Sequence, residues 1–366
     1  MADRFTLGIE EEFQLVDPET RALKSHIEEM MAAGAHLGDQ LKPELHQSVV
    51  EVGTPICGDI REARAAVVNL RRSLIAMAEK SGARIVAAGT HPFSHWKDQE
   101  ITDRVRYKDI VNEMEDLARA NLIFGLHVHV GVEDDEMRIQ IQNGVRSFLP
   151  HLLALSVNSP FWCGRKTGVK SVRSTIFKRF PRTQIPDYFY SWEDYAKYVE
   201  LLVRTNCIDD GKKIWWDIRP HAYFKTLEFR VCDIPCRAEE TVGIAALCQA
   251  LVAKLHRLFE SNLGIRMYPR AILEENKFRA LKLGLDGKMI DFGLKQEAPT
   301  RALILEVLNF VDDVLDDLGT REEVRFLHAW AASGNTGADR QLSVFQKTGS
   351  LPAVVDTLVD ETRQGL

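Results

Sequence analysis

Three consecutive glutamates near the start of the chain constrain its fold most strongly. Glu10, Glu11 and Glu12 interrupt an apolar run whose pattern predicts a strand over about Phe5–Val16. Because successive side chains of a strand point to opposite faces, Glu10 and Glu12 share one face and Glu11 takes the other. Two neighbouring carboxylates repel, and a hard divalent cation is the usual compensation. A solvated sheet face is the alternative interpretation.

Three other strand-like segments, residues 44–52, 125–131 and 226–231, carry polar side chains at alternate positions. Those side chains are Glu44, His46, Ser48, His127, His129, Glu228 and Arg230, with Glu51 out of strict alternation. One polar strand face is ordinary in an antiparallel sheet. Four such segments in one chain predict a single sheet with one charged, ligand-binding face.

Six strands are predicted in all, at about Phe5–Val16, His46–Val52, Arg84–Gly89, Gly125–Val132, Ile214–Arg219 and Thr226–Val231. Helical periodicity fills the gaps after Asp59 and over Arg104–Leu122, Glu136–Val157, Trp192–Thr205, Glu239–Phe259, Arg270–Leu283, Arg301–Leu318 and Arg321–Ala332. Capping boxes are predicted at Asp59 with Glu62 and at Thr320 with Glu323. We expect one α+β domain over residues 1–366, with helices on the apolar face of a mainly antiparallel sheet and a mostly helical part from about residue 239.

Charge and composition exclude several classes of protein. The net charge of −6 argues against a general nucleic-acid binder. No apolar run approaches membrane-spanning length and no apolar leader precedes the first strand, so we expect a cytoplasmic protein without a membrane partner. The 6 cysteines lie far apart, which favours reduced thiols over a disulfide framework or a zinc site.

A basic segment between residues 164 and 186 contains no acidic residue. Most of its cations fit a solvated loop. Arginine is also the residue best suited to clamp phosphate or carboxylate groups, and Arg173 and Arg182 lie among apolar and turn residues that suggest ordered backbone. The chain has no phosphate-binding glycine loop, so a nucleotide would bind through metal and basic side chains.

The acidic set and the arginines together suggest a chemistry. The set consists of Glu10, Glu12, Glu51, His129 and Glu228. Oxygen ligands with one imidazole favour Mg²⁺, with Mn²⁺ as the alternative, over zinc. Acids that hold metal beside arginines that stabilise charge suit ATP-dependent phosphoryl transfer. Metal-assisted hydrolysis on the same ligands is the alternative.

Several motifs resemble the glutamate–cysteine ligase type 2, or carboxylate–amine ligase, family of the glutamine-synthetase-like superfamily. The resemblance covers about residues 5–290 and rests on the combination rather than on any one motif. The matching segments are Gly8–Phe13, His46–Pro55, Ala88–Pro92, Gly125–Val130, Arg173–Thr175, Pro181–Thr183, Trp216–Pro220, Thr226–Arg230 and Glu275–Lys277.

The resemblance implies a curved, mainly antiparallel six-stranded sheet with helices on its convex face and the active site on its concave face. It implies that the acidic set holds Mg²⁺ and, through it, the ATP phosphates. Arg230 would stabilise charge on the transferred phosphoryl group, and Arg173 and Arg219 would contact phosphate or substrate carboxylates. Arg173, Arg182 and Lys277 would contribute to nucleotide binding. Glu51, which is out of phase in the predicted strand, depends on this resemblance or on a bulge.

The same resemblance implies the reaction. Family members activate a carboxylate with ATP as an acyl phosphate, and an amine then displaces phosphate. Glutamate and cysteine, giving γ-glutamylcysteine, are the default substrates, while another amino acid or a small polyamine stays open as the amine. A metal-dependent hydrolase and a degenerate nucleotide-binding protein are the alternatives. A homodimer is expected by analogy.

Several neighbouring residues receive structural roles instead. We expect His127 to support His129, and His46 and His91 to be structural or to lie at the rim of the site. Trp215 and Trp216 are interpreted as core and rim packing, with base stacking as the minority option. Asp217 is predicted to orient Arg219.

Overall fold

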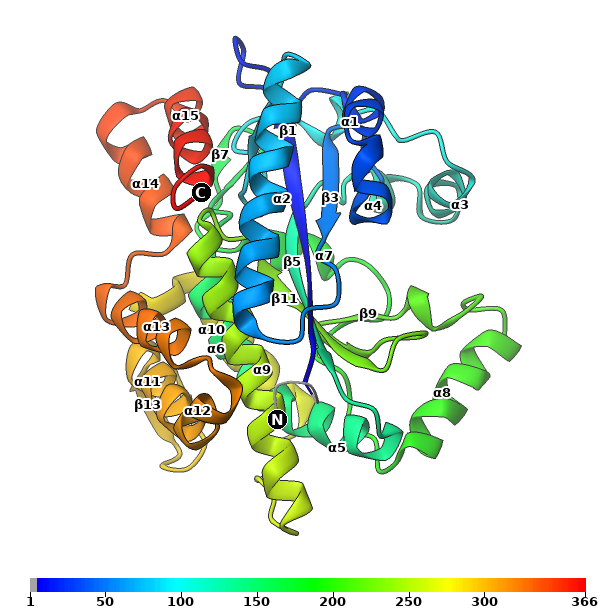
Figure 1. The fold of residues 1–366 in the computed structure, drawn as a ribbon, viewed down its shortest axis with the longest axis vertical. Coiled ribbons are helices and arrows are strands. Elements are labelled where there is room, and N and C mark those ends of the chain that lie inside the picture. Colours follow the sequence, from blue (N-terminus) through cyan, green and yellow to red (C-terminus); the bar gives the residue numbers. More distant parts are fainter. Residues whose placement is uncertain (1–4) are drawn as a thin grey trace.

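A seven-stranded sheet lies at the centre of the molecule, whose computed structural model describes residues 5–366. The strands follow the order β10-β11-β5-β1-β3-β2, and β4 pairs with the end of β1 (Figure 1). Their bounds are β1 Leu7–Val16, β2 Leu41–Pro43, β3 Val49–Gly53, β4 Arg84–Val86, β5 Gly125–Gly131, β10 Ile218–Pro220 and β11 Thr226–Asp233. Every pairing within this sheet is antiparallel, which confirms the predicted fold class, but the sheet has seven strands instead of the expected six because β2 was not predicted.

The register of the sheet brings polar side chains from separate strands onto one face. The directly opposed pairs are Glu12 with Glu51, Glu10 with His127, and Glu228 with His129. Directly opposed residues of an antiparallel pair point to the same side of the sheet. Residues of β1, β5 and β11 therefore form one charged face, as their alternation predicts, and the segment 44–52 adds Glu51, which was out of alternation in the prediction.

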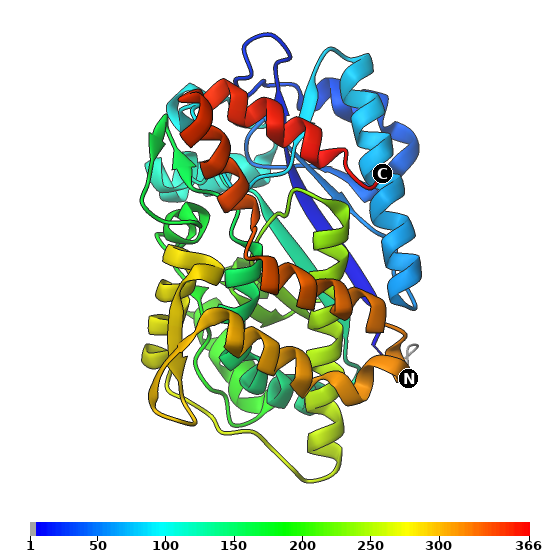
Figure 2. The ribbon, with the colours of Figure 1, turned by 90° about the vertical axis from the view of Figure 1, so that its left-hand side faces the viewer.

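Three helices cover the other face of the sheet: α2 (Ile60–Lys80), α6 (Leu149–Ser156) and α9 (Ala238–Glu260) (Figures 1 and 2). Helix α2 packs on β1, α6 on β11, and α9 on β1 and β5. By length and composition α9 could cross a membrane, but most of its apolar stretch is buried inside the molecule. One apolar cluster extends from Phe5 through these helices to Ala338 of the C-terminal part.

Three of the predicted strands differ clearly from the observed ones. The strand predicted over Arg84–Gly89 ends at Val86. Residues 44–48 form a turn between β2 and β3, so the strand begins at Val49 instead of His46. This turn restarts the alternation and brings Glu51 into phase with Glu12. The segment predicted as one strand over 214–219 is broken at Asp217 into β9 (Trp215–Trp216) and β10, and β9 pairs in parallel with β8 (Thr183–Gln184) outside the main sheet.

The remaining helices are α1 Ile27–Ala33, α3 Val105–Met114, α4 Asp116–Arg119, α5 Asp135–Val145, α7 Val172–Phe177, α8 Trp192–Arg204, α10 Arg270–Leu283, α11 Thr300–Phe310, α12 Leu315–Leu318, α13 Arg321–Ser333, α14 Gly337–Thr348 and α15 Leu351–Thr362. Three predicted helices are therefore shorter than expected. Positive φ at Glu115 separates α3 from α4. A 3-10 turn precedes α6, which has Pro150 in its first turn. Another 3-10 turn at Asp312–Val314 separates α11 from α12.

The C-terminal part is mostly but not wholly helical. It contains a hairpin of β12 (Lys288–Asp291) and β13 (Gln296–Pro299) that the sequence pattern did not reveal. The predicted cap at Asp59 is confirmed, because its carboxylate accepts the amides of Arg61 and Glu62, but the capping box is incomplete: the Glu62 carboxylate accepts the amide of Gly58 instead of that of Asp59. The predicted cap at Thr320 is wrong: its hydroxyl makes no capping bond, and Glu323 pairs with Arg64 of α2 instead.

Candidate active site

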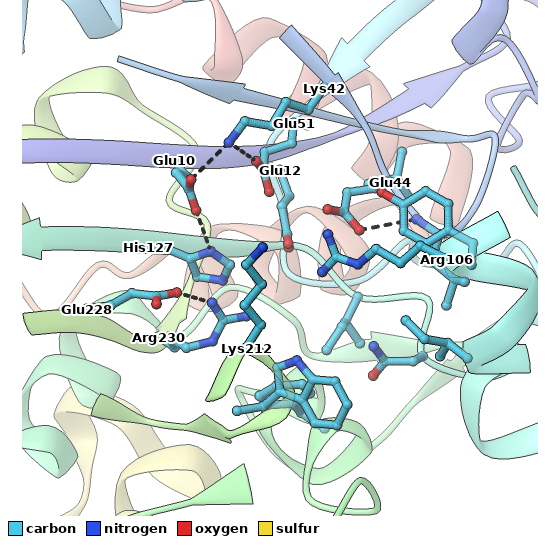
Figure 3. Close-up of a pocket in the computed structure, with 18 of the residues that line it drawn as sticks. Glu10, Glu12, Lys42, Glu44, Glu51, Arg106, His127, Lys212, Glu228 and Arg230 are labelled. Atoms are coloured by element: carbon cyan, nitrogen blue, oxygen red, sulfur yellow. Dashed lines mark hydrogen bonds and ion pairs between the residues drawn. The ribbon is translucent and has the colours of Figure 1, made fainter. Parts of the chain in front are cut away.

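A cavity of about 820 Å³ lies over the charged face of the sheet (Figure 3). Its acidic wall comes from β1, β3, β11 and the turn after β2, and consists of Glu10, Glu12, Glu44, Glu51 and Glu228. Its cationic lining consists of Lys42, Arg104, Arg106, Arg173, Lys212, Arg219 and Arg230. The lining also includes apolar and aromatic side chains: Tyr107, Ile110, Ile123, Phe177, Phe180 and Trp215.

The carboxylates lie close enough to share ligands. Three groups have ligand atoms that all lie within 4.8 Å of one another: Glu10, Glu51 and His127; Glu10, His129 and Glu228; and Glu12, Glu44 and Glu51. Glu10 and Glu51 each belong to two groups, so the three groups adjoin. All five residues predicted as metal ligands from the sequence are among them.

Lys42 of β2 is the cation nearest to two of these acids. Its Nζ lies 3.1 Å from Oε1 of both Glu10 and Glu51 (Figure 3). The main-chain N–H of Gly125 donates to Glu12 Oε2 at 2.5 Å. Arg173 and Arg230 also attract Glu12, and Arg106 attracts Glu44.

Burial is the largest influence on the pKa values of Glu12, Glu44 and Glu51. Burial raises the pKa of Glu12 to about 7 against the attraction of Arg173, and raises that of Glu44 to about 7 with help from the Glu12 charge. Burial and then the Glu10 charge raise the pKa of Glu51 to about 8. A bound cation would favour the ionised forms, so these acids would release protons as they take up metal.

Glu228 has the opposite environment. Burial would raise its pKa, but Arg230 and Arg219 outweigh burial and hold that pKa well below its ordinary value. Arg219 Nε donates to Glu228 Oε2 at 2.7 Å, and Arg230 donates to Glu228 Oε1. Glu228 is therefore ionised in the free protein and fixes both arginines at the cavity wall.

Arg173 reaches the cavity from α7 by lying across the sheet. A Cβ on Gly125 would be 2.4 Å from Arg173 Nη2, so only glycine leaves room for the guanidinium there. The guanidinium donates to the carbonyls of Arg230 and Val231 at 3.3 and 3.4 Å, while its buried Nε has no hydrogen-bond partner in the described residues 5–366. Arg173 itself is among the residues that line the cavity.

A buried carboxylate, Asp233, fixes the start of the helix that carries Arg173. Its oxygens accept the hydroxyls of Ser159 and Ser171 at 2.6 and 2.8 Å and the amide of Asn158 at 2.9 Å. Ser171 in turn caps the N-terminus of α7. The predicted basic loop therefore contains an anchored helix, which explains why Arg173 is ordered although it stands in a cation-rich segment.

The histidines fall into two groups, and the contact of His127 is with Glu10 and not, as predicted, with His129. His127 and His129 both line the cavity, and His127 Nδ1 lies 3.4 Å from Glu10 Oε2. His46 also touches the cavity, but its ring bonds to the carbonyl of Arg119, and His91 is buried with its ring bonded to the carbonyl of Arg21. Burial lowers the pKa of both His46 and His91 to about 4, which fits neutral structural residues.

Two predicted nucleotide-binding residues lie outside the described cavity lining. Lys277 is buried, with its Nζ 2.5 Å from Asp217 Oδ2. Arg182 donates through Nε to the carbonyl of Lys213, with its guanidinium over the Trp215 ring. Asp217 therefore pairs with Lys277 and not with Arg219, contrary to the sequence prediction. The observed partners lie far apart in the sequence, so no local pattern joined them.

The cavity also contains residues that the sequence did not single out as site residues. The sequence pattern marks Glu44 only as a polar strand residue. The turn at residues 44–48 places it beside Glu12 and Glu51. No sequence pattern indicates Lys42 or Arg106 as a site residue. Arg106, in the first turn of α3, points toward Glu12 and Glu44 in Figure 3. Trp215 lines the cavity, whereas Trp216 packs in an apolar cluster with α8, as the packing interpretation predicted.

Comparison with known sequences agrees with this arrangement. The sequence profile of glutamate–cysteine ligase family 2 (GCS2) matches residues 6–357. The chain belongs to this family. A Solibacter usitatus protein that carries the provisional name glutamate–cysteine ligase 2 is 56% identical over 363 residues, covering 99% of this chain and 94% of the relative. A Roseiflexus protein with the same provisional name is also 56% identical, with 99% and 96% coverage.

Membership in the family identifies the chain as an ATP-dependent ligase that forms an amide bond, as the sequence predicted. Two solved structures share the fold. A glutamate–cysteine ligase from Francisella tularensis, solved with AMP, has a TM-score of 0.72 at 13% identity and covers 99% of this chain and 89% of its own. A bifunctional glutathione synthetase from Pasteurella multocida has a TM-score of 0.72 at 15% identity, with 99% and 52% coverage. At these identities the likeness establishes the fold alone.

Proposed function

We propose that this ligase activates the γ-carboxylate of glutamate with ATP as an acyl phosphate and couples it to an amine, with cysteine as the default amine. The observation that carries the proposal is the meeting of three adjoining acidic groups with Arg173, Arg219 and Arg230 in one cavity. Acids that can hold metal beside arginines that can hold a phosphoryl group are what carboxylate activation by ATP requires.

The residues of the charged face fit Mg²⁺. The ligand atoms are carboxylate oxygens with at most one imidazole in a group, which is the donor set of a hard cation, and Mn²⁺ would fit the same set. The buried Nε2 of His129 makes no hydrogen bond within the described residues. Glu10, Glu12, Glu51, His129 and Glu228, together with Glu44, would hold the metal. Bound there, Mg²⁺ would neutralise the negative charge of the ATP phosphates.

The chain's own cations would act on the reacting groups. In the first step a γ-carboxylate oxygen bonds to the terminal phosphorus of ATP, the bond from that phosphorus to the bridging oxygen breaks, and ADP leaves. Arg230, which Glu228 fixes, would stabilise negative charge on the transferred group. Arg173 and Arg219, which line the same cavity, would hold phosphate or a substrate carboxylate.

In the second step the amine nitrogen bonds to the acyl carbon, the carbon–oxygen bond to phosphate breaks, and the nitrogen loses a proton. The aromatic part of the cavity, with Phe180 and Trp215, offers apolar surface for the nucleotide base. The AMP in the Francisella ligase of the same fold supports nucleotide binding here.

Release of ADP and phosphate tests the proposal most simply. The protein is incubated with Mg·ATP and glutamate, and amines including cysteine, other amino acids and small polyamines are added one at a time. Turnover that requires both glutamate and one amine is the expected result and names the amine. Phosphate release that is indifferent to every carboxylate and amine would instead indicate a nucleotide hydrolase.

Arg230→Ala sharpens the assignment within the site. We expect kcat to fall by about 100-fold or more, because the lost charge acts on the transferred group in the transition state. The KM for ATP should change little. Steady-state kinetics with varied ATP distinguish this from a binding role, for which KM would rise at nearly constant kcat.

A further inference from the structure

Strand β11 is distorted at Arg230, the arginine that we propose stabilises charge on the transferred group. Phe229 pairs with Val128 and Cys232 with Leu126, so two residues of β11, Arg230 and Val231, face the single residue His127 of β5. This is a β-bulge, a distortion that commonly re-aims a side chain beside an active site. The direction of the Arg230 side chain therefore depends on what holds the bulge.

The bulge is held by Asp217, which breaks the segment between β9 and β10. The carbonyl of Asp217 accepts the main-chain N–H of Arg230 at 2.8 Å, and the N–H of Asp217 donates to the carbonyl of Gln184 at 2.9 Å. Arg219, the other arginine on Glu228, follows Asp217 by two residues. One short stretch of main chain thus sets the positions of both arginines.

Asp217 is itself held by a residue from the C-terminal part. Lys277 of α10 is 2% exposed and Asp217 is 3% exposed. Lys277 Nζ lies 2.5 Å from Asp217 Oδ2 and 3.1 Å from Gln184 Oε1. A buried carboxylate without its cation is strongly unfavourable, so loss of Lys277 would force this segment to rearrange.

We propose that Lys277 is a positioning residue, which holds Arg230 and Arg219 at the cavity wall through its ion pair with Asp217. Lys277 does not touch the nucleotide. The resemblance of residues 275–277 to the family suggested a nucleotide contact, but the ammonium group pairs with Asp217, and Lys277 is absent from the described lining of the cavity. The kinetic consequence of this proposal rests on the ligase function proposed above.

The first test needs no turnover. Amide hydrogen exchange at Arg230 reports the bond to Asp217 directly, and it should accelerate at least about tenfold in Lys277→Met relative to the native protein. Arg340→Met is the matched control, because Arg340 forms a comparably buried ion-pair network with Glu240 and Glu361 among α9, α14 and α15, away from the cavity. That control should leave exchange at Arg230 unchanged. Unchanged exchange in Lys277→Met would overturn the proposal.

The second test is kinetic. Lys277→Met should lower kcat by about 100-fold with a KM for ATP within about threefold of the native value, as expected for misplaced catalytic groups. In an Arg230→Ala background the same change should lower kcat much less, because the group that it positions is gone. The proposal would be contradicted if Lys277→Met lowered kcat by the same factor in the native and Arg230→Ala backgrounds. A raised KM for ATP at constant kcat would also contradict it.

Asp217→Asn provides the same tests if Lys277→Met does not fold, because the side chain keeps its shape and loses only its charge. We expect faster exchange at Arg230 and a fall in kcat of about tenfold. If the native protein shows no glutamate- and amine-dependent turnover, the proposed reaction fails while the exchange data still decide the role of Lys277. Normal turnover in both variants would contradict that role alone.

Discussion

Glu11 and Glu12 are neighbours on β1, yet their carboxylates lie in opposite surroundings. Glu11 faces the helices, where Arg71 of α2 donates to its two oxygens at 2.5 and 3.1 Å and Thr241 of α9 donates at 2.7 Å. Glu12 faces the cavity among other acids, and burial raises its pKa to about 7. The first carboxylate is satisfied within the protein, whereas the second is the one for which we propose a bound cation. Under that proposal, adjacent identical residues serve stability on one face and ligand binding on the other.

The largest expected effect is on turnover, in Glu12→Gln. The change removes a proposed metal ligand and should lower kcat by about 100-fold or more. Stability without metal should stay the same or rise slightly, because carboxylate repulsion is relieved. Turnover assays and thermal unfolding with and without Mg²⁺ measure both. Marked unfolding of this variant would make Glu12 a structural residue like Glu11.

Glu228→Gln sharpens the comparison within the cavity. It should also abolish turnover, but it leaves Arg219 and Arg230 without their shared carboxylate, so we expect lower stability than in Glu12→Gln. Thermal unfolding of the two variants side by side checks the difference. Equal stability would show that the two arginines find other partners.

On the helix face the expected effect is on stability. Arg71→Met should lower the free energy of unfolding by about 3–5 kcal/mol, because it leaves the Glu11 carboxylate buried and unpaired. Urea unfolding measures the loss, and the folded fraction should keep its kcat. The double variant Glu11→Gln with Arg71→Met should recover part of the stability. A loss below about 1 kcal/mol would remove the contrast between the two faces.

The raised pKa values of Glu12, Glu44 and Glu51 predict a pH dependence. These values are about 7, 7 and 8, above the ordinary value of 4.5. The three groups therefore contribute fully to the free energy of unfolding below pH 4.5, where they are protonated in both states. That contribution is lost as the pH rises to about 8, because the folded protein then has to bury ionised carboxylates. Each unit of raised pKa corresponds to about 1.4 kcal/mol.

The free energy of unfolding without metal should therefore fall between about pH 5 and pH 8, and less so in Glu44→Gln. Mg²⁺ should stabilise the protein more at pH 8 than at pH 5, because its ligands are then ionised. Urea unfolding at several pH values, with and without Mg²⁺, measures both effects. Identical pH profiles for the native protein and Glu44→Gln would contradict the raised pKa of that group.

The smallest expected effect concerns Gly125→Ala. The added Cβ would meet Arg173 Nη2 at 2.4 Å and displace the guanidinium, so kcat should fall by about tenfold. Gly8→Ala on β1 is the control, since the nearest atom to its Cβ is 3.5 Å away. Steady-state kinetics of both variants decide whether the position of Arg173 matters. Equal activity of the two would show that Arg173 tolerates displacement.

The charged face could be predicted from the sequence because alternation along a strand is local. Glu10, Glu12, His129 and Glu228 share a face in their own strands, and antiparallel pairing then opposes the strands. Glu51 could not be placed in this way, since a turn at residues 44–48 resets the alternation. The prediction was therefore incomplete for those cavity residues that strand alternation does not place.

Long-range pairing explains the remaining misses. Lys277 and Asp217 lie 60 positions apart, and only the packing of α10 against the β9–β10 segment brings them together. Lys42 is also brought to its partner by long-range pairing, because it reaches Glu10 only when β2 pairs with β3. A sequence pattern reports which residues share an element and a face, but not which elements meet.

The central claim is that the charged face of β1 activates a carboxylate with ATP. Glutamate labelled with ¹⁸O in its carboxylates tests this directly, by mass spectrometry of the phosphate released in the presence of ATP and the accepted amine. An acyl phosphate transfers one labelled oxygen to each released phosphate, which is the predicted result. Unlabelled phosphate, with oxygen taken from water instead, would contradict carboxylate activation and identify a hydrolase.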